Sequence, residues 1–267
     1  MCDEYLLGHS AREWDRLKAQ HALWRDTLLC HLPEMNGQRV LELGCGNGTL
    51  LAELAEMVGP FGQTVAIERD ELAATAARAA APDADVRTGD LMDTDLGGPH
   101  DLIVARWVFS FLPDPAAAIR RAVERLAPGG RILIQDYNHD GVRVFPRLPA
   151  FERAISAYRA AYAASGGDLW IGPSIPGMLR AAGLRVDTIS PAVKTGPPGS
   201  PTWRWVERFV FEHLPTITAS SSDASSDALL SPGEVRALRE QWERARRDAD
   251  ALLFSPIQVC VVGQKLR

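Results

Sequence analysis

Apolar positions in the first half of the chain alternate between the spacing of strands and the spacing of helices. Short apolar runs bounded by Gly, Pro or charged residues predict strands at 39–43, 64–67, 86–88, 101–105 and 131–135. Apolar residues at helical spacing predict intervening helices at 49–58, 70–81 and 115–126. Strands that alternate with helices form parallel βαβ units. We therefore expect an α/β sheet with helices on both faces.

The pattern changes after residue 140. Residues 141–182 read as mainly helical, further helices are expected at 202–214 and 231–252, and two last strands at 184–189 and 257–264. These strands complete a seven-stranded, mostly parallel sheet. The predicted organisation has four parts. Residues 1–35 form a helical lid, residues 36–140 the core and residues 141–182 a helical cap segment. Residues 183–267 carry the last two strands, with inserted helices at 197–253.

Composition narrows the functional classes. The 267 residues are 46% hydrophobic and 24% charged, which suits one large α/β domain with or without an inserted cap. A net charge of −5 disfavours a nucleic-acid partner, because phosphate contacts require a basic face. The four cysteines form no C-x-x-C pair, and no His/Cys/Asp/Glu cluster has metal-ligand spacing, so no metal is expected.

The terminus and the residue usage predict where the protein works. The first residues are charged and lack the apolar region of a signal peptide, and no apolar stretch is long enough to span a membrane. We therefore expect a cytoplasmic protein without a membrane partner. The high content of Ala, Arg and Gly points to a GC-rich bacterial source. The oligomeric state is left open between monomer and homodimer.

The strongest local signal is the segment LELGCGNGT, residues 41–49, between a predicted strand and a predicted helix. Glycines there remove the Cβ atoms that would keep a ligand away from the backbone. The dinucleotide fingerprint G-x-G-x-x-G does not fit, because Thr49 stands where its third glycine belongs. No Walker loop is present either. A tight turn without a ligand is the plain structural alternative.

Acidic residues follow three successive predicted strands. Glu42 ends the first strand, Glu68 ends the second and Asp90 follows the third. Ligands of open α/β sheets bind outside the carboxyl ends of the strands. A carboxylate after the second strand suits the two hydroxyls of a ribose, and Asp90 suits an adenine amine. Together the three acids predict a nucleoside site.

The chain here resembles the class I S-adenosylmethionine-dependent methyltransferases, a Rossmann-like family, across roughly residues 36–137. VLELGCGNGTL, VAIERD and GDLMD resemble its first three motifs. DLIVARWVFSFLPDPAAAIRRAVERLAPGGRILIQDYN resembles strands four and five of the ubiquinone-biosynthesis-like branch, as does the N-terminal YLLGHSAREWDRLKAQ. The resemblance implies methyl transfer from S-adenosylmethionine, with S-adenosylhomocysteine as product.

The same resemblance assigns cofactor contacts. It places the glycine loop against methionine and ribose, Glu68 on the ribose, Asp90 on adenine and Arg106 beside the methionine group. It also lets N-terminal residues, including Arg16, close over the methionine end. The implied cofactor-binding residues are Tyr5, Gln20, Glu42, Gly44, Cys45, Gly46, Asn47, Gly48, Glu68, Arg69, Asp90, Leu91, Met92, Arg106 and Trp107.

Candidates for the acceptor side follow the fifth strand. Histidine ordinarily titrates near neutral pH, so His139 is the expected general base, with Tyr137 orienting the substrate. A loop histidine bonded to Asp136 or Asp140 is the structural alternative. The expected substrate-binding residues are His9, Trp107, Asn138 and Trp170. Trp107, Trp170, Trp203 and Trp205 form either an aromatic wall or ordinary core packing.

Three other functions compete with transfer to the oxygen, nitrogen or carbon of a small molecule. A cofactor-binding protein without methyl transfer would lack an open acceptor pocket. An RNA or protein methyltransferase would show a basic rim, and the residues after the fourth strand, ARWV, lack the N-P-P-Y type motif. An NAD(P)-dependent oxidoreductase is disfavoured by the loop spacing and by Tyr162, which stands four residues after Tyr158 in place of a lysine.

Overall fold

The computed structural model describes residues 11–218 and 229–266. They form two compact units. The sheet unit contains residues 24–137, 170–192 and 258–266, and the helical unit contains the described parts of 11–23, 138–169 and 193–257. The expected lid helix, α1 (Ala11–Leu29), is shared between them. Its last turns belong with the sheet, because Leu28 and Leu29 pack into the sheet core.

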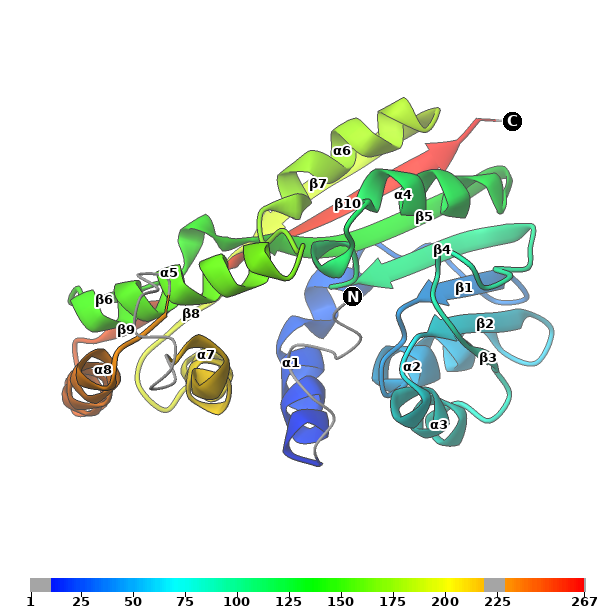
Figure 1. The fold of residues 1–267 in the computed structure, drawn as a ribbon. Coiled ribbons are helices and arrows are strands. Elements are labelled where there is room, and N and C mark those ends of the chain that lie inside the picture. Colours follow the sequence, from blue (N-terminus) through cyan, green and yellow to red (C-terminus); the bar gives the residue numbers. More distant parts are fainter. Residues whose placement is uncertain (1–10, 219–228, 267) are drawn as a thin grey trace. The chain divides into compact units, whose positions relative to one another are not determined.

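The sheet unit is built on seven strands in the order β3-β2-β1-β4-β5-β10-β7 (Figure 1). The strands are β1 (Arg39–Leu43), β2 (Gln63–Glu68), β3 (Asp85–Thr88), β4 (His100–Arg106), β5 (Leu126–Asn138), β7 (Leu184–Ala192) and β10 (Ile257–Lys265). β1 is parallel to β2 and β4, and β4 is parallel to β5, whereas β10 is antiparallel to β7. The predicted seven-stranded, mostly parallel sheet is therefore confirmed.

Helices cover both faces of this sheet, with α2 and α3 on one side and α4 and α6 on the other (Figure 1). They are α2 (Thr49–Val58), α3 (Glu71–Ala80), α4 (Pro115–Glu124) and α6 (Ile171–Ala181). Local chemistry fixes where they begin. Asp70 accepts a hydrogen bond from the backbone of Ala73, and Asp114 accepts one from Ala117, each satisfying a free N–H of the first turn.

The apolar core on the α1 and α2 face follows the two-residue period of the strands. Its buried members from the sheet are Val40, Leu102, Val104, Leu133, Cys260 and Val262, and those from the helices include Leu28, Leu50 and Leu54. One step closer to the carboxyl edge, the same face carries polar side chains. The core therefore ends where the candidate site begins.

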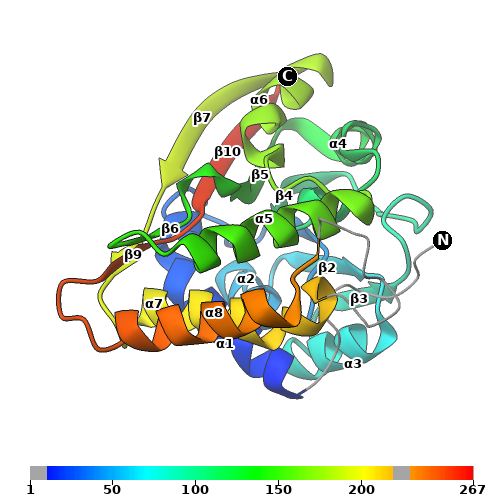
Figure 2. The same cartoon turned by 60° about the vertical axis from the view of Figure 1, so that its left-hand side comes forward.

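The helical unit packs around tryptophans. It contains α5 (Pro149–Ala164), α7 (Pro201–Glu212) and α8 (Pro232–Ala245) (Figure 2). A capping box between Ser231 and Glu234 begins α8. The rings of Trp203 and Trp242 lie 4.8 Å apart. Trp203 is fully buried and Trp205 is 5% exposed, so both are core residues. For these two residues the aromatic-wall alternative is wrong.

A small second sheet was not predicted. Its strands β6 (Arg143–Phe145), β8 (Thr195–Gly196) and β9 (Leu252–Phe254) pair in the order β6-β9-β8. Two or three residues are too few to show a strand period, so the pattern read 143–145 and 252 as helical. β5 also begins earlier than expected, at Leu126, with a register shift against β4 that accommodates Pro128-Gly129-Gly130.

Candidate active site

The glycine loop links β1 to α2 through three residues in the left-handed region. Gly44, Gly46 and Gly48 have φ values of 63°, 54° and 78°. A Cβ on Gly44 would lie 2.6 Å from Val108 Cγ2, and one on Gly48 would lie 2.6 Å from Ala77 Cα. At Gly46 a Cβ would meet nothing within 4 Å. Two glycines therefore serve packing, and the middle one leaves open space beside the backbone.

Glu68 at the end of β2 is bonded to this loop. Its Oε2 accepts a hydrogen bond from Gly46 N at 2.7 Å, and its Oε1 accepts one from Asp70 N at 3.0 Å. Each carboxylate oxygen has two lone pairs, so both oxygens keep acceptor capacity. Glu68 thus fixes the loop and still offers acceptors for a pair of hydroxyls. Asn47 turns inward and accepts from Thr49 Oγ1 at 2.7 Å.

Glu42 and Arg106 place a carboxyl group and a guanidinium near the ends of β1 and β4. Glu42 is only 3% exposed, and burial raises its pKa to about 8, with Glu68 raising it further and Arg106 opposing. Burial lowers the pKa of Arg106 to about 10, and Glu42 opposes that shift. Glu42 Oε2 and Arg106 Nη1 have no hydrogen-bond partner in the described part of the chain. A buried carboxyl oxygen and a buried guanidinium nitrogen are thus each short of one partner.

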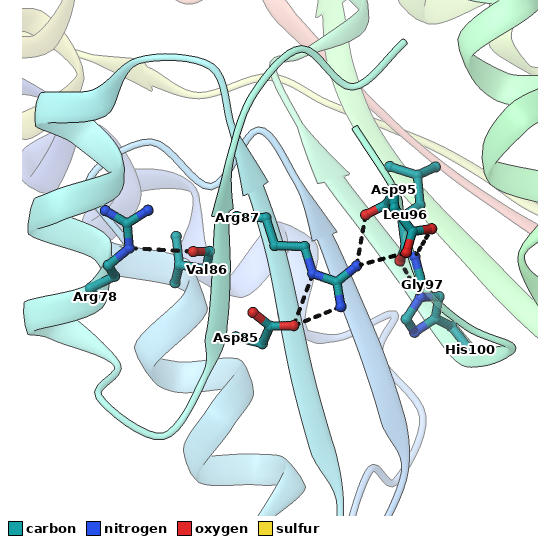
Figure 3. Close-up of polar contacts among 8 residues, drawn as sticks. All are labelled: Arg78, Asp85, Val86, Arg87, Asp95, Leu96, Gly97 and His100. Atoms are coloured by element: carbon teal, nitrogen blue, oxygen red, sulfur yellow. Dashed lines mark hydrogen bonds and ion pairs between the residues drawn. The ribbon is translucent and has the colours of Figure 1, made fainter. Parts of the chain in front are cut away.

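The segment after β3 carries the expected adenine contacts, and two arginines hold it. Asp90 Oδ1 accepts from Met92 N at 2.8 Å, and Arg121 of α4 donates to the carbonyls of Leu91 at 3.0 Å and Thr94 at 2.5 Å. Arg87 of β3 reaches the Asp95 carbonyl at 2.7 Å (Figure 3). The backbone amide of Leu91 is therefore offered on a segment fixed from both sides.

Trp107 adopts φ 55° directly after β4, a conformation costly for a bulky residue. Its Nε1 donates to Gln258 Oε1 at 2.6 Å. The centroid of the Trp107 ring lies 6.1 Å from the Tyr137 ring centroid and 4.7 Å from Arg106 Cζ. Buried Asp136 accepts from the backbone of Phe109 and Ser110, which fixes the next turn. The indole is therefore held at the carboxyl edge of the sheet.

The remaining candidates in the sheet unit differ in exposure. Arg69 is exposed, Met92 and Trp170 are each 36% exposed, and Cys45 is buried, with a pKa raised by burial. No group of three or more His, Cys, Asp or Glu that could hold a metal is found in residues 11–218 and 229–266. None of the helices described there has the length and apolar character of a membrane span.

Three expected site residues belong to the helical unit. Gln20 is 2% exposed, and its Oε1 accepts from Arg16 Nη1 at 2.5 Å and from Trp205 Nε1 at 3.0 Å. His139 is 3% exposed, its carbonyl accepts from Arg159, and burial lowers its pKa to about 3. Such a histidine is neutral, as a base must be, but a weak base. Asn138 accepts from Asp140 N at 3.1 Å. Tyr5 and His9 lie outside the described residues.

Four further residues of the sheet unit belong to the site but were not predicted from the sequence. They are Arg121, which fixes residues 91–94, Asp136, which fixes the turn after β4, Gln258, which accepts from the Trp107 ring, and Gln135, which donates to Thr27 and Cys260. A polar residue inside an apolar strand run is a usable signal for the two glutamines. Arg121 gives no such signal, because it sits on an amphipathic helix where arginines are ordinary.

A family model described as a methyltransferase domain matches residues 14–189. The chain belongs to the methyltransferase domain family. Among its relatives, the demethylmenaquinone methyltransferase of Lactococcus lactis is 26% identical over 157 residues, covering 55% of this chain and 60% of the relative. The trans-aconitate 2-methyltransferase of Deinococcus radiodurans is 34% identical over 113 residues, 41% of this chain and 42% of the relative. The chain thus matches about half the length of these relatives.

The fold agrees with the family. An S-adenosylmethionine-dependent methyltransferase from Mesorhizobium loti superposes with a TM-score of 0.52 at 16% identity, covering 92% of this chain and 99% of that one. Identity this low supports the fold alone. The resemblance to class I methyltransferases is confirmed, and the family and fold imply S-adenosylmethionine as the cofactor.

Proposed function

We propose that this methyltransferase domain transfers a methyl group from S-adenosylmethionine to a small-molecule acceptor. The observation that carries the proposal is a pair of buried atoms, the carboxyl oxygen Glu42 Oε2 and the guanidinium nitrogen Arg106 Nη1, which lack partners in the described chain. An α-amino acid group carries an ammonium, which a carboxylate binds, and a carboxylate, which a guanidinium binds. The methionine end of the cofactor has both.

The surrounding residues fit the rest of the cofactor. The open backbone at Gly46 accepts close approach, Glu68 offers acceptors to ribose hydroxyls, and Asp90 with the Leu91 amide suits adenine. When bound, S-adenosylmethionine supplies a methyl group on a sulfonium, already activated for displacement. Cys45, Asn47, Arg69, Met92 and Trp107 are proposed as flanking contacts, and Tyr5 and Gln20 as contacts from the N-terminal segment.

The protein then has to hold the acceptor in line with the methyl group. Orientation of this kind contributes up to about 7–11 kcal/mol in favourable cases. Trp107 and Tyr137 offer flat aromatic surface, and we keep Trp170, Asn138 and His9 as further acceptor contacts. His139 stays the proposed base for acceptors that must lose a proton. Its lowered pKa favours acceptors that are already weakly acidic.

The relatives support a small-molecule acceptor. Their names identify a demethylmenaquinone methyltransferase and a trans-aconitate 2-methyltransferase. The net charge of −5 argues against RNA. The free cysteines among the described residues, Cys30, Cys45 and Cys260, agree with our proposal of a bacterial cytoplasmic enzyme.

Calorimetry with S-adenosylhomocysteine and 5′-methylthioadenosine tests the cofactor assignment, with NAD and NADP as controls. The second ligand lacks the amino acid end. We expect S-adenosylhomocysteine to bind at least tenfold more tightly than 5′-methylthioadenosine, and Arg106→Met to remove most of that difference. Glu68→Gln should weaken both ligands, and Glu56→Gln, an exposed acid on α2, should weaken neither. A folded protein that binds no adenosyl ligand would sink the proposal.

Turnover is the second readout. Methyl transfer from labelled S-adenosylmethionine to trans-aconitate, to a quinol and to a panel of phenols and amines separates an enzyme from a cofactor-binding protein. Transfer to any small molecule supports the proposal. Tight cofactor binding with transfer only to RNA or protein favours an RNA or protein methyltransferase. Tight cofactor binding with transfer to none of these acceptors favours a cofactor-binding protein without methyl transfer.

A further inference from the structure

Four polar side chains, each with a buried polar atom, lie across the face of the sheet that α1 and α2 cover. They are Glu42, Arg106, Gln135 and Gln258, on the neighbouring strands β1, β4, β5 and β10. Each stands two residues from a member of the apolar core, respectively Val40, Val104, Leu133 and Cys260. Residues two apart on a strand share a face. Arg106 and Gln135 are register partners at the carboxyl edge of that core, and Glu42 lies one step inside this edge, opposite Val104.

Each of these four side chains has one buried polar atom without a partner among the described residues. The atoms are Glu42 Oε2, Arg106 Nη1, Gln135 Oε1 and Gln258 Nε2, so acceptors and donors alternate in strand order. An unsatisfied buried polar atom costs about 1–3 kcal/mol. Glu42 and Arg106 are accounted for by the proposed cofactor. The open atoms of the two glutamines, which are both fully buried, are not explained by the cofactor.

Contacts within the sheet unit fix the orientation of both amides. Thr27 donates its hydroxyl hydrogen to the Trp24 carbonyl, so it can only accept from Gln135 Nε2, at 3.0 Å. Trp107 Nε1 donates to Gln258 Oε1 at 2.6 Å, and rotating that amide would set two donors face to face. Gln135 therefore presents a carbonyl oxygen, and Gln258 presents an N–H.

The two amides lie on the same face of the neighbouring strands β5 and β10. Gln135 Nε2 lies 3.2 Å from Cys260 Sγ, and Gln258 stands two residues from Cys260 on the same face of β10. Such diagonal neighbours on adjacent strands lie about 7–8 Å apart at their backbones, within reach of long side chains. The smallest group that can donate to one amide and accept from the other is a hydroxyl.

We propose that Gln135 and Gln258 bind a hydroxyl group of the methyl acceptor, with Gln135 Oε1 receiving its hydrogen and Gln258 Nε2 donating to its oxygen. This inference rests on the proposed function and names the acceptor class, an alcohol or a phenol. The phenol is favoured, because the indole that orients Gln258 also stacks with Tyr137 and so offers an aromatic surface beside the amide. The strained Trp107 backbone is held in place by that same bond.

Three probes of one ring size test the assignment on protein saturated with S-adenosylhomocysteine. 2-Naphthol donates and accepts, 2-methoxynaphthalene only accepts, and naphthalene does neither. By ligand-observed NMR we expect the wild type to bind 2-naphthol about three- to tenfold more tightly than 2-methoxynaphthalene, and the latter more tightly than naphthalene by a similar factor. Equal binding of the three probes, or no binding, overturns the proposal.

Each glutamine has its own signature. Gln135→Met should abolish the preference for 2-naphthol over 2-methoxynaphthalene, and Gln258→Met should abolish the preference for 2-methoxynaphthalene over naphthalene. Gln264→Met, the same change at the other end of β10, should alter neither. If both preferences survive in the site variants, the amides bind only water and the proposal is wrong. Should Gln135→Met fail to fold, Gln258→Met, which keeps the Gln135 acceptor oxygen, should still show the first preference.

Failure of this inference can be told apart from failure of the proposed function. S-Adenosylhomocysteine binding is measured first on every variant, and circular dichroism checks the fold. A wild type that does not bind the nucleoside contradicts the proposed function itself. A wild type that binds the nucleoside but treats the three probes alike contradicts only the hydroxyl site.

Discussion

At the scale of single residues, Glu42 shows how burial and function oppose each other. Its carboxyl group sits on a fully apolar strand run and is 3% exposed, so the charged form is poorly solvated. Burial together with Glu68 raises its pKa to about 8, and the nearby Arg106 only partly offsets this. The residue is therefore protonated at neutral pH until a cation arrives.

This predicts a pH-dependent affinity. The ammonium group of the ligand binds the carboxylate, so Glu42 has to lose its proton when S-adenosylhomocysteine binds. The affinity should therefore rise between about pH 6.5 and pH 8.5, by up to about tenfold per pH unit. Glu42→Gln should flatten the profile and weaken binding at pH 8.5. Calorimetry in buffers of different ionisation enthalpy measures the proton released. A wild-type profile as flat as that of the variant contradicts the assignment.

The raised pKa of Glu42 also affects the stability of the fold. It makes the unliganded protein less stable as the pH rises, whereas a carboxyl group with a lowered pKa makes a protein more stable. Unfolded Glu42 loses its proton near pH 4.5, whereas the folded state keeps it until about pH 8. Between these values the folded state binds more protons, so raising the pH lowers the free energy of unfolding. Glu42→Gln should therefore stabilise the unliganded protein at pH 8.5, by about 1–3 kcal/mol. Urea unfolding at pH 5 and pH 8.5 checks it.

Sequence reasoning reached the charged residues of the site more easily than the neutral ones. Glu42, Glu68 and Asp90 end successive strands, so their placement follows from strand order. Gln135 and Gln258 interrupt apolar runs but carry no charge, and their role depends on which amide atom is already bonded. That information lies in contacts with Thr27, Cys260 and Trp107, which are distant in sequence.

At the scale of elements, the glycine loop combines two separable demands. Gly48 closes α2 against α3, where a Cβ would strike the Ala77 backbone, and Gly46 leaves space beside the chain. The spacing of the glycines predicted the turn from sequence. The separate roles of Gly46 and Gly48 could not be predicted, because they depend on how closely α3 packs.

Two alanine substitutions separate these demands. Gly48→Ala should destabilise the fold by several kcal/mol, because a clash with backbone adds to the strain of φ 78°. Gly46→Ala should cost only about 1–2 kcal/mol of strain, yet should weaken S-adenosylhomocysteine binding at least tenfold. Thermal unfolding and calorimetry give the two quantities independently. Unchanged nucleoside binding in Gly46→Ala would contradict the placement of the ligand at this loop.

At the scale of the whole molecule, the chain consists of two units that the sequence predicted unequally. Most strands and helices of the sheet unit follow a strong period and were predicted within a few residues, whereas β5 begins at Leu126 instead of residue 131 and α6 was expected only as part of a helical stretch, 141–182. The helical unit takes its segments from three parts of the chain and closes them with a sheet of two- and three-residue strands. Such pairings arise from tertiary packing around Trp203 and Trp242, which no local pattern encodes.

Hydrogen exchange tests how far cofactor binding reaches across the molecule. The contacts assigned to Glu42, Glu68 and Leu91 lie in the sheet unit, so S-adenosylhomocysteine should slow exchange in the glycine loop and in residues 89–94. If Gln20 contacts the cofactor as expected, hydrogen exchange should also slow in α1 around Gln20. We expect at least tenfold slower exchange at saturating ligand, because bound protein exchanges only after the ligand leaves. Glu68→Gln at the same ligand concentration is the control and should lose both effects. Protection confined to the sheet unit would leave the nucleoside site intact but show that the N-terminal helix does not close over the cofactor.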